Sequence, residues 1–224
     1  SAAILLQSSQ TIEIAASKII QTNGGTITLR SNSTGAALAA ASSIILNSGS
    51  TLSSQGGNIT LGGNFTGLQG AGLYATSSNA PAVLIDGGIL TAGGGNIKIY
   101  GKCSGSYDDG IRLRGNITTS GSGNVELYGE AHGGNNGTNY FGGITFGTAA
   151  GSTIETENGN LILDGYLTNT QSNSTGAINF YRMDGSTGQT NHINLLSKTG
   201  NVMVKADRGT TGAYGMGHSS WGHV

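Results

Sequence analysis

The chain of 224 residues has a formal net charge of −1, and only 9% of its residues are charged. This weak charge gives no basis for binding nucleic acid or for attraction to acidic membranes. Glycine is abundant, with 41 residues against a single proline, so the fold needs many tight turns but lacks the composition of collagen. No apolar run approaches the roughly 20 residues of a membrane-spanning helix. The lone Cys103 excludes an internal disulfide and a thiolate zinc site.

A short pattern, Gly-Asn followed by alternating apolar residues, recurs along the chain. It begins at Gly57, Gly95, Gly123, Gly159 and Gly200, and a variant with Thr in place of Asn begins at Gly25. The intervals between these starts vary, which indicates a constant strand followed by loops of changing length. We call each interval a repeat and its first strand the first arm.

Two further strand-like arms follow in each repeat. The second arm starts with a small residue and reads GLYAT from Gly72, GIRLR from Gly110, GITFG from Gly143 and AINFY from Ala177. The third arm places an apolar residue shortly before the next start, at Leu52, Leu90, Ile117 and Ile154. The N-terminal segment SKIIQTNGG is a copy of the third arm. Three strands per repeat, separated by Gly, Asn and Ser turns, indicate a coil that closes on itself.

We therefore predict an all-β fold, a right-handed parallel β-helix (β-solenoid) of about six three-strand coils with variable loops. Residues 1–224 are expected to form a single domain with repeat starts near 25, 57, 95, 123, 159 and 200. Residues 1–24 are expected to form a partial coil that opens in the third arm. Residues 200–224 are expected to form a partial coil and a tail.

Alternation in the first arm predicts which side chains are buried. Two apolar columns face inward, Ile59, Ile97, Val125, Leu161 and Val202 in one, and Leu61, Ile99, Leu127, Leu163 and Val204 in the other. A further inward column contains Phe65, Cys103, Ala131 and Leu167, so Cys103 is interpreted as a small buried hydrophobe. On the outward side we expect three stacked pairs, Lys98 with Glu126, Lys102 with Glu130, and Tyr100 with Tyr128. The recurring Asn58, Asn96, Asn124, Asn160 and Asn201 are expected to cap the turn into this arm.

The stretch SYDDGIRLRG concentrates charge in a chain that otherwise has little. Paired acids beside cations are typical of enzymes that cleave sugars, but such sites draw acids from several strands. The aligned positions in the neighbouring repeats, 70–71 and 141–142, supply no second carboxylate. We therefore predict no enzymatic activity, no cofactor and no metal. The cluster is interpreted as mutually paired groups that face water and form a candidate contact patch, made of Asp108, Asp109, Arg112 and Arg114.

The segments GGNITLGGNFTG, ILTAGGGNIKIYG and ITTSGSGNVELYG resemble the repeat region of filamentous haemagglutinin-type exoproteins and related bacterial β-strand-repeat surface proteins. The resemblance spans nearly the whole chain. It implies a right-handed parallel β-helix, export across the cell envelope, and a role in adhesion, fibre formation or biofilm structure. Because some members of this family carry sugars on Asn, three Asn-x-Ser/Thr triplets in expected loops are candidate glycan acceptors, at Asn32, Asn136 and Asn173.

We interpret the chain as a structural subunit or segment of an extracellular bacterial surface fibre with an adhesive or biofilm role. Its expected partners are a second copy of itself, joined head to tail through the terminal coils, and surface glycans; neither nucleic acid nor membrane insertion is expected. The last coil would lack the arm that the N-terminus supplies, so one chain would complete the next. A fragment cut from a longer exoprotein would have the same two ends. The alternatives are a carbohydrate-binding adhesin module without self-assembly and a polysaccharide-cleaving β-helix enzyme.

Overall fold

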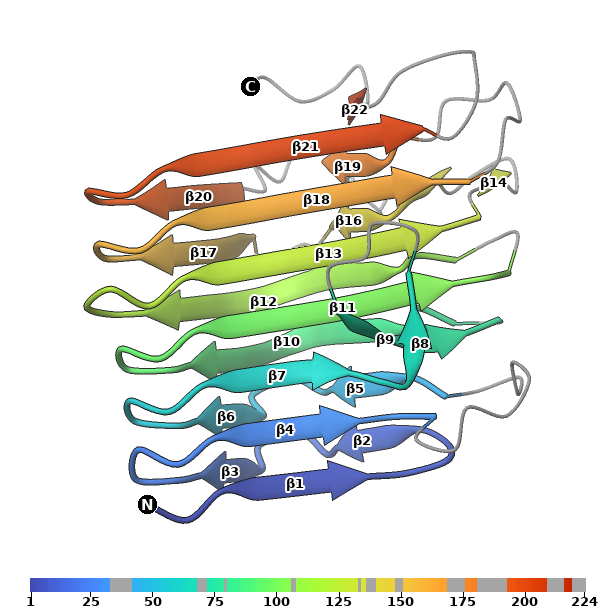
Figure 1. The fold of residues 1–224 in the computed structure, drawn as a ribbon. Coiled ribbons are helices and arrows are strands. Elements are labelled where there is room, and N and C mark those ends of the chain that lie inside the picture. The colour runs from blue at the N-terminus through green and yellow to red at the C-terminus, as the bar shows by residue number, and fades with distance from the viewer. Residues whose placement is uncertain are drawn as a thin grey trace.

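The structure is a computed structural model that describes residues 1–32, 42–67, 72–78, 80–105, 108–132, 134–135, 140–147, 151–168, 176–180, 193–208 and 216–218. Within these ranges every regular element is a β-strand, and almost all of the strands pair in parallel. The chain passes back and forth between two sheets and adds strands from the N-terminal end to the C-terminal end (Figure 1). This all-β arrangement is consistent with a β-solenoid.

The first sheet collects the first arm of each repeat. Its parallel path runs through β1 (Ile4–Gln7), β4 (Ile27–Arg30), β7 (Ile59–Gly62), β11 (Ile97–Cys103), β13 (Val125–Ala131), β18 (Leu161–Leu167) and β21 (Val202–Arg208). The register follows the sequence pattern, because each apolar residue after Gly-Asn pairs with its equivalent in the next repeat, as Ile59 does with Ile97 and Ile97 with Val125. The predicted inward columns of this arm are therefore confirmed in the interior of the stack, where their members are fully buried.

The second and third arms belong together to the second sheet. Second-arm strands are β2 (Ile12–Ile14), β5 (Ile44–Leu46), β16 (Ile144–Phe146), β19 (Ile178–Phe180) and β22 (Met216–His218). Third-arm strands are β3 (Ile19–Gln21), β6 (Thr51–Ser53), β17 (Ser152–Thr156) and β20 (Ile193–Ser197). Two longer strands, β10 (Val83–Thr91) and β12 (Ile111–Thr119), run through both arms and join them. A β-bulge between Asp86 and Ile89, with Gly87 at a φ of 74°, bends β10 where the two arms meet.

The glycine that starts each repeat is required by close stacking of the backbones. A Cβ built on Gly95 would collide with the carbonyl oxygen of Gly57, and a Cβ on Gly123 would collide with that of Gly95. The same overlap recurs at Gly159 and Gly200. Neighbouring repeats approach so closely at this turn that only a residue without a side chain fits.

The N-terminal segment differs from the prediction. Residues 19–21 form a third-arm strand, as expected, because β3 pairs with β6. Before it, however, β1 pairs with β4 in the first sheet and β2 pairs with β5 in the second. The expectation that the chain opens in the third arm with only a partial coil is therefore wrong, since residues 4–21 supply all three arms.

An inserted hairpin changes the assignment of GLYAT. The segment forms β9 (Leu73–Ser77), which pairs antiparallel with β8 (Phe65–Thr66) and parallel with β11 in the first sheet. It is not a second arm; residues 83–86 of β10 take that role. Phe65 consequently lies outside the inward column, and Ser77 lies opposite Cys103 in its place. A second antiparallel pair, β14 (Gly134–Asn135) and β15 (Tyr140–Phe141), also departs from the parallel stack.

Cys103 is buried, as predicted. It packs with Ala131, Leu167 and Ala177 in a small apolar cluster beside the main core. Burial raises the pKa of its thiol to about 12, so at neutral pH the sulfur is an uncharged packing group.

Candidate functional site

The charged cluster lies where the chain enters β12, and Asp109 is its centre. One carboxylate oxygen of Asp109 accepts a hydrogen bond from Arg112 Nε at 2.6 Å. Its other oxygen accepts from the backbone N–H of Gly142 at 2.8 Å and from Thr145 Oγ1 at 2.5 Å. Arg112 Nη2 also donates to Asp108 Oδ1 at 2.9 Å. The carboxylate of Asp109 therefore joins the start of β12 to the following repeat.

The expectation that all four charged residues face water is wrong. Asp109 is fully buried, while Asp108 and Arg112 are mostly buried. The Arg112 guanidinium lies 5.8 Å from the centre of the Phe141 ring, so the following repeat covers the cluster. Arg114 lies apart from it, because its Nη1 contacts Asp86 Oδ1 at 3.4 Å in the preceding repeat. The structure thus brings three of the four predicted residues together and gives the fourth a different partner.

The electrostatics of the cluster favour a structural role for its two acids. Burial raises the pKa of Asp108 to about 6, although the charge of Arg112 opposes this shift. Burial also raises the pKa of Asp109, against Arg112 and the hydrogen bonds from Thr145 and Gly142. An acid with no exposed atom, and with both oxygens already bonded within the protein, is poorly placed to exchange a proton with a substrate. The geometry instead makes Asp109 a connection between repeats.

The outer face of the first sheet carries the charged and aromatic pairs that the repeat alignment predicts. Lys98 Nζ lies 3.1 Å from Glu126 Oε2, and Lys102 Nζ lies 2.6 Å from Glu130 Oε1. The rings of Tyr100 and Tyr128 stack with centroids 5.3 Å apart and planes 8° apart. All three predicted stacked pairs are confirmed, so the outward side chains also fix the register of the parallel strands.

Sequence reasoning missed how the β8–β9 hairpin extends the tyrosine stack. Tyr74 of β9 is fully buried, and its ring meets that of Tyr100 edge to face with centroids 5.6 Å apart. A Cβ on Gly72 would lie 2.6 Å from the Tyr100 ring, so the hairpin closely covers this part of the sheet. The sequence from Gly62 to Gly72 gives no sign of this hairpin, because the GLYAT segment follows the pattern of a second arm.

The recurring asparagines form a ladder along the axis. The Oδ1 atom of Asn58 accepts from the backbone N–H of Asn96 at 2.8 Å, and that of Asn96 accepts from Asn124 at 2.8 Å. The series continues from Asn124 to Asn160 at 2.7 Å and from Asn160 to Asn201 at 3.0 Å. Each side chain therefore caps the turn of the next repeat, which adds a bond between repeats to the expected capping of turns.

The candidate glycan acceptors differ in what the structure says of them. Asn32 is fully buried, has a left-handed φ of 47°, and donates from Nδ2 to Thr76 Oγ1 at 3.0 Å. Asn32 lies in a bend after β4, outside the strands as expected, but its amide nitrogen is inaccessible in the folded chain, which makes it a poor glycan acceptor. Asn136 and Asn173 lie outside the described residues. Asn64 begins a further Asn-x-Thr triplet, directly before β8, and is exposed.

Both ends of the stack expose apolar side chains. In the terminal strands, inward-column residues lose the cover that their equivalents have inside the stack. The exposed large apolar residues of the described terminal strands are Leu5, Leu6, Ile19, Leu196, Val202, Met203 and Val204. Figure 1 places β1 and β3 at one end of the stack and β20 and β21 towards the other.

Comparisons with known proteins return no similarity. The sequence matches no family model, and no curated protein or solved structure matches it. Among the described residues, no group of three His, Cys, Asp or Glu side chains is arranged to hold a metal ion. The same ranges contain no helix long and apolar enough to span a membrane.

Proposed function

We propose that the chain is a structural, non-enzymatic segment of an extracellular bacterial surface fibre. In this proposal it forms a right-handed parallel β-helix of about six three-strand coils and joins further copies head to tail. The observation that supports it most is the exposure of apolar side chains on both β1 and β21, where Leu5 shares a column with Met203 and Leu6 shares one with Val204. The charged cluster has a place in this proposal as one of the connections that hold neighbouring repeats together.

The inward columns support end-to-end pairing. Val202 is 45% exposed, although the residues paired below it in the same column, Leu161 and Val125, are fully buried. Ile4 occupies this column at the other end of the stack. A second copy added in the same register would place its Ile4 over Val202 and its Leu6 over Val204. Both open edges would then gain backbone partners and apolar cover.

The outward column gives the same register. Leu5 is 55% exposed and Met203 is 51% exposed, and both lie in the column that contains Thr28, Thr60, Lys98 and Glu126. Thr28, Thr60, Lys98 and Glu126 of that column are polar, whereas Leu5 at one end and Ile162 and Met203 towards the other end are apolar. End-to-end pairing would bring Leu5 and Met203 together and remove both from water.

Within each chain, the contacts between repeats suit a load-bearing rod. The parallel ladders, the asparagine series and the pairs Lys98–Glu126 and Lys102–Glu130 all run along the same axis. Each repeat contacts its neighbours directly, so stability accumulates with length as in other repeat proteins. The variable loops are then free to contact the surroundings.

The proposal is tested by the assembly state of the purified protein. We expect electron microscopy and sedimentation to show rods that lengthen with concentration, and we expect Val202→Glu to keep the protein monomeric. Ser120→Glu adds the same charge at an exposed lateral turn and is the matched control, which should still assemble. Single particles of one chain length at every concentration would contradict head-to-tail assembly. Assembly of Val202→Glu at the wild-type level would contradict the proposed interface.

The register is tested by cysteine pairs. With Cys103 replaced by Ser, Leu5→Cys and Met203→Cys in one chain should give disulfide-linked polymers under mild oxidation. Leu5→Cys with Leu196→Cys serves as the mismatched control, because Leu196 belongs to the third arm. Equal cross-linking of both pairs would show that chains associate without the proposed register.

A further inference from the structure

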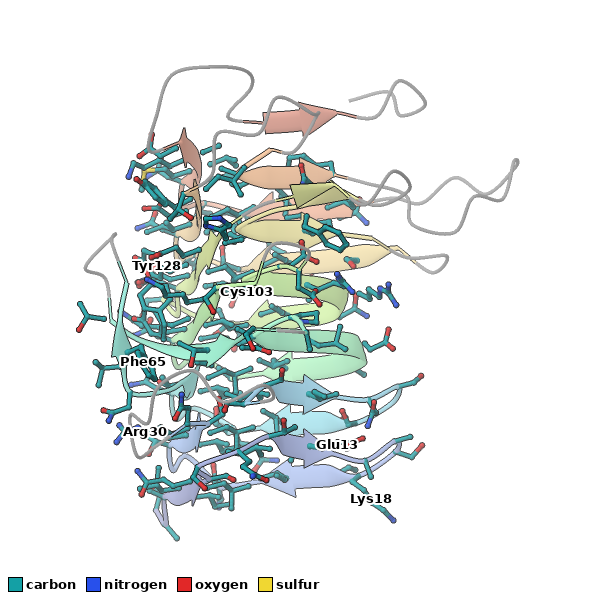
Figure 2. All side chains as sticks on the ribbon, turned by 90° about the vertical axis from the view of Figure 1, so that its right-hand side faces the viewer. Glu13, Lys18, Arg30, Phe65, Cys103 and Tyr128 are labelled. Atoms are coloured by element: carbon teal, nitrogen blue, oxygen red, sulfur yellow. The ribbon has the colours of Figure 1, made fainter. Side chains whose placement is uncertain are left out.

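A groove on the outer face of the first sheet lies between β4 and the β8–β9 hairpin. It has a volume of about 210 Å³, and its walls include Thr28, Arg30, Thr60, Leu73 and Tyr100. This volume is below that of a pocket for a drug-sized molecule, so the groove suits a single ring-sized group. Figure 2 shows Arg30 and Phe65 on the same side of the molecule, with Arg30 nearer the N-terminal end.

The groove exists because of a missing side chain and an inserted strand. Gly62 pairs with Arg30 in the neighbouring strand, and it puts no side chain between Arg30 and Tyr100. A Cβ on Gly62 would lie 2.5 Å from the carbonyl oxygen of Leu73, so the approach of the hairpin depends on this glycine. The half-exposed side chain of Leu73 forms one wall.

Arg30 is unusual among the cations of this fold. The other half-buried cations in the described ranges, Lys98, Lys102, Arg112 and Arg114, each have a carboxylate oxygen within 3.4 Å. Arg30 lies instead between Gln7 and Gly62 in the neighbouring strands. No described acidic residue makes an ion pair with it. A half-buried guanidinium that lines a groove without a carboxylate is suited to bind an anion.

We propose that this groove binds the carboxylate of an acidic sugar residue, such as a uronic acid within a polysaccharide. The planar guanidinium of Arg30 holds the carboxylate through two parallel hydrogen bonds. Thr28 and Thr60 are direct cross-strand partners on the same outward face as Arg30, and their hydroxyl groups hydrogen-bond to the sugar hydroxyls. The open side of the groove lets the rest of the polysaccharide continue into solvent.

The two threonines favour a sugar over an acidic peptide. A peptide carboxylate would need only Arg30, whereas a pyranose ring presents hydroxyl groups that use the threonine pair as donors and acceptors. This inference deepens the adhesive part of the proposed function and rests on it. It does not require head-to-tail assembly, because the groove lies on the side of the stack and draws its residues from one chain.

The test measures binding of polygalacturonate by titration calorimetry, with neutral galactan as the comparison polymer. We expect polygalacturonate to bind and galactan not to bind. Arg30→Gln should weaken binding by roughly tenfold or more, because it removes a charge-assisted pair. Lys18→Gln is the matched control: it removes an exposed cation that Figure 2 places away from Arg30. This variant should bind within about twofold of the wild type.

Two further variants make the test independent of folding and specific for sugar. Arg30→Lys keeps the charge without the planar fork and should give an intermediate loss if Arg30→Gln fails to fold. Thr28→Val with Thr60→Val should weaken binding of polygalacturonate but not of polyglutamate. Polyglutamate that binds as tightly as polygalacturonate, with the same dependence on Arg30, would overturn the assignment to sugar.

Other outcomes overturn the site itself. These are no binding of polygalacturonate by the wild type, an equal loss in Lys18→Gln, and no loss in a folded Arg30→Gln. Binding should be measured in the monomeric Val202→Glu variant as well as in the wild type. Intact assembly without polygalacturonate binding refutes only this inference, and binding by a protein that never assembles refutes only the fibre.

Discussion

Replacing Asp109 with Ala is expected to destabilise the fold strongly, because its buried carboxylate connects three donors. The change leaves the N–H of Gly142, the hydroxyl of Thr145 and Nε of Arg112 without their partner. An unsatisfied buried donor costs roughly 1–3 kcal/mol, and breaking a buried ion pair from one side costs about 3–5 kcal/mol. Because Arg112 keeps its bond to Asp108, we expect a loss of about 3–4 kcal/mol in the free energy of unfolding.

The ion pair between Asp86 of β10 and Arg114 of β12 supplies the control. Asp86 is about half exposed and lies 3.4 Å from Arg114, so Asp86→Ala should cost no more than about 1 kcal/mol. Urea unfolding followed by circular dichroism would compare the midpoints, with unchanged slopes as the condition for comparing free energies. Thr145→Val removes a single donor, so its loss in the free energy of unfolding should lie between those of Asp86→Ala and Asp109→Ala. The reasoning is refuted if Asp109→Ala costs no more than Asp86→Ala.

Three further predictions concern the contacts between repeats. Gly95→Ala should cost more than about 2 kcal/mol in urea unfolding, since its Cβ would meet the carbonyl of Gly57, and a neutral effect would contradict the required close stacking. Asn124→Ala should cost about 1 kcal/mol by the same assay, because the N–H of Asn160 loses its acceptor; Asn124→Asp, which keeps an acceptor, should cost less. The raised pKa of Asp108, about 6, means that the folded chain binds this proton more tightly than the unfolded chain. Its stabilising contribution is complete below pH 4 and is lost as the pH rises through 6, by on the order of 2–3 kcal/mol, and Asp108→Asn should abolish this part of the pH dependence.

Features that repeat in the sequence could be predicted, because parallel stacking places equivalent residues next to one another. The pairs Lys98–Glu126 and Tyr100–Tyr128 follow once the Gly-Asn starts are aligned. The burial of Cys103 follows from the same alignment, because alternate residues of a strand face inward and Cys103 lies two positions after Gly101 in the inward set. In each case the contact can be predicted from the sequence of one strand and that of the equivalent strand in the next repeat.

Features that break the repeat could not be predicted in this way. The segment from Gly72 has the small first residue and the alternation of a second arm, yet it forms β9 of an inserted hairpin. The strand at Ile4 lacks the Gly-Asn start, so the first arm at the N-terminus gave no signal. The buried carboxylate of Asp109 depends on a backbone N–H supplied by Gly142, about 30 residues further along the chain. The alternation of residues within β12 does not predict this contact.

The distribution of apolar and charged side chains favours joining along the axis rather than side by side. On the outer face of the first sheet, Lys98 and Lys102 are already paired with glutamates of the next repeat. Most of the exposed large apolar residues in the described ranges lie instead on the terminal strands, Leu5, Leu6, Val202, Met203 and Val204 in the first sheet and Ile19 and Leu196 in the third arm of the second sheet. Strand edges with unpaired backbone groups and apolar side chains are templates for a further strand. End-to-end joining covers both edges at once, whereas lateral contact covers neither. In the proposed fibre the groove at Arg30 would stay open to solvent in every copy, because it lies on the side of the stack.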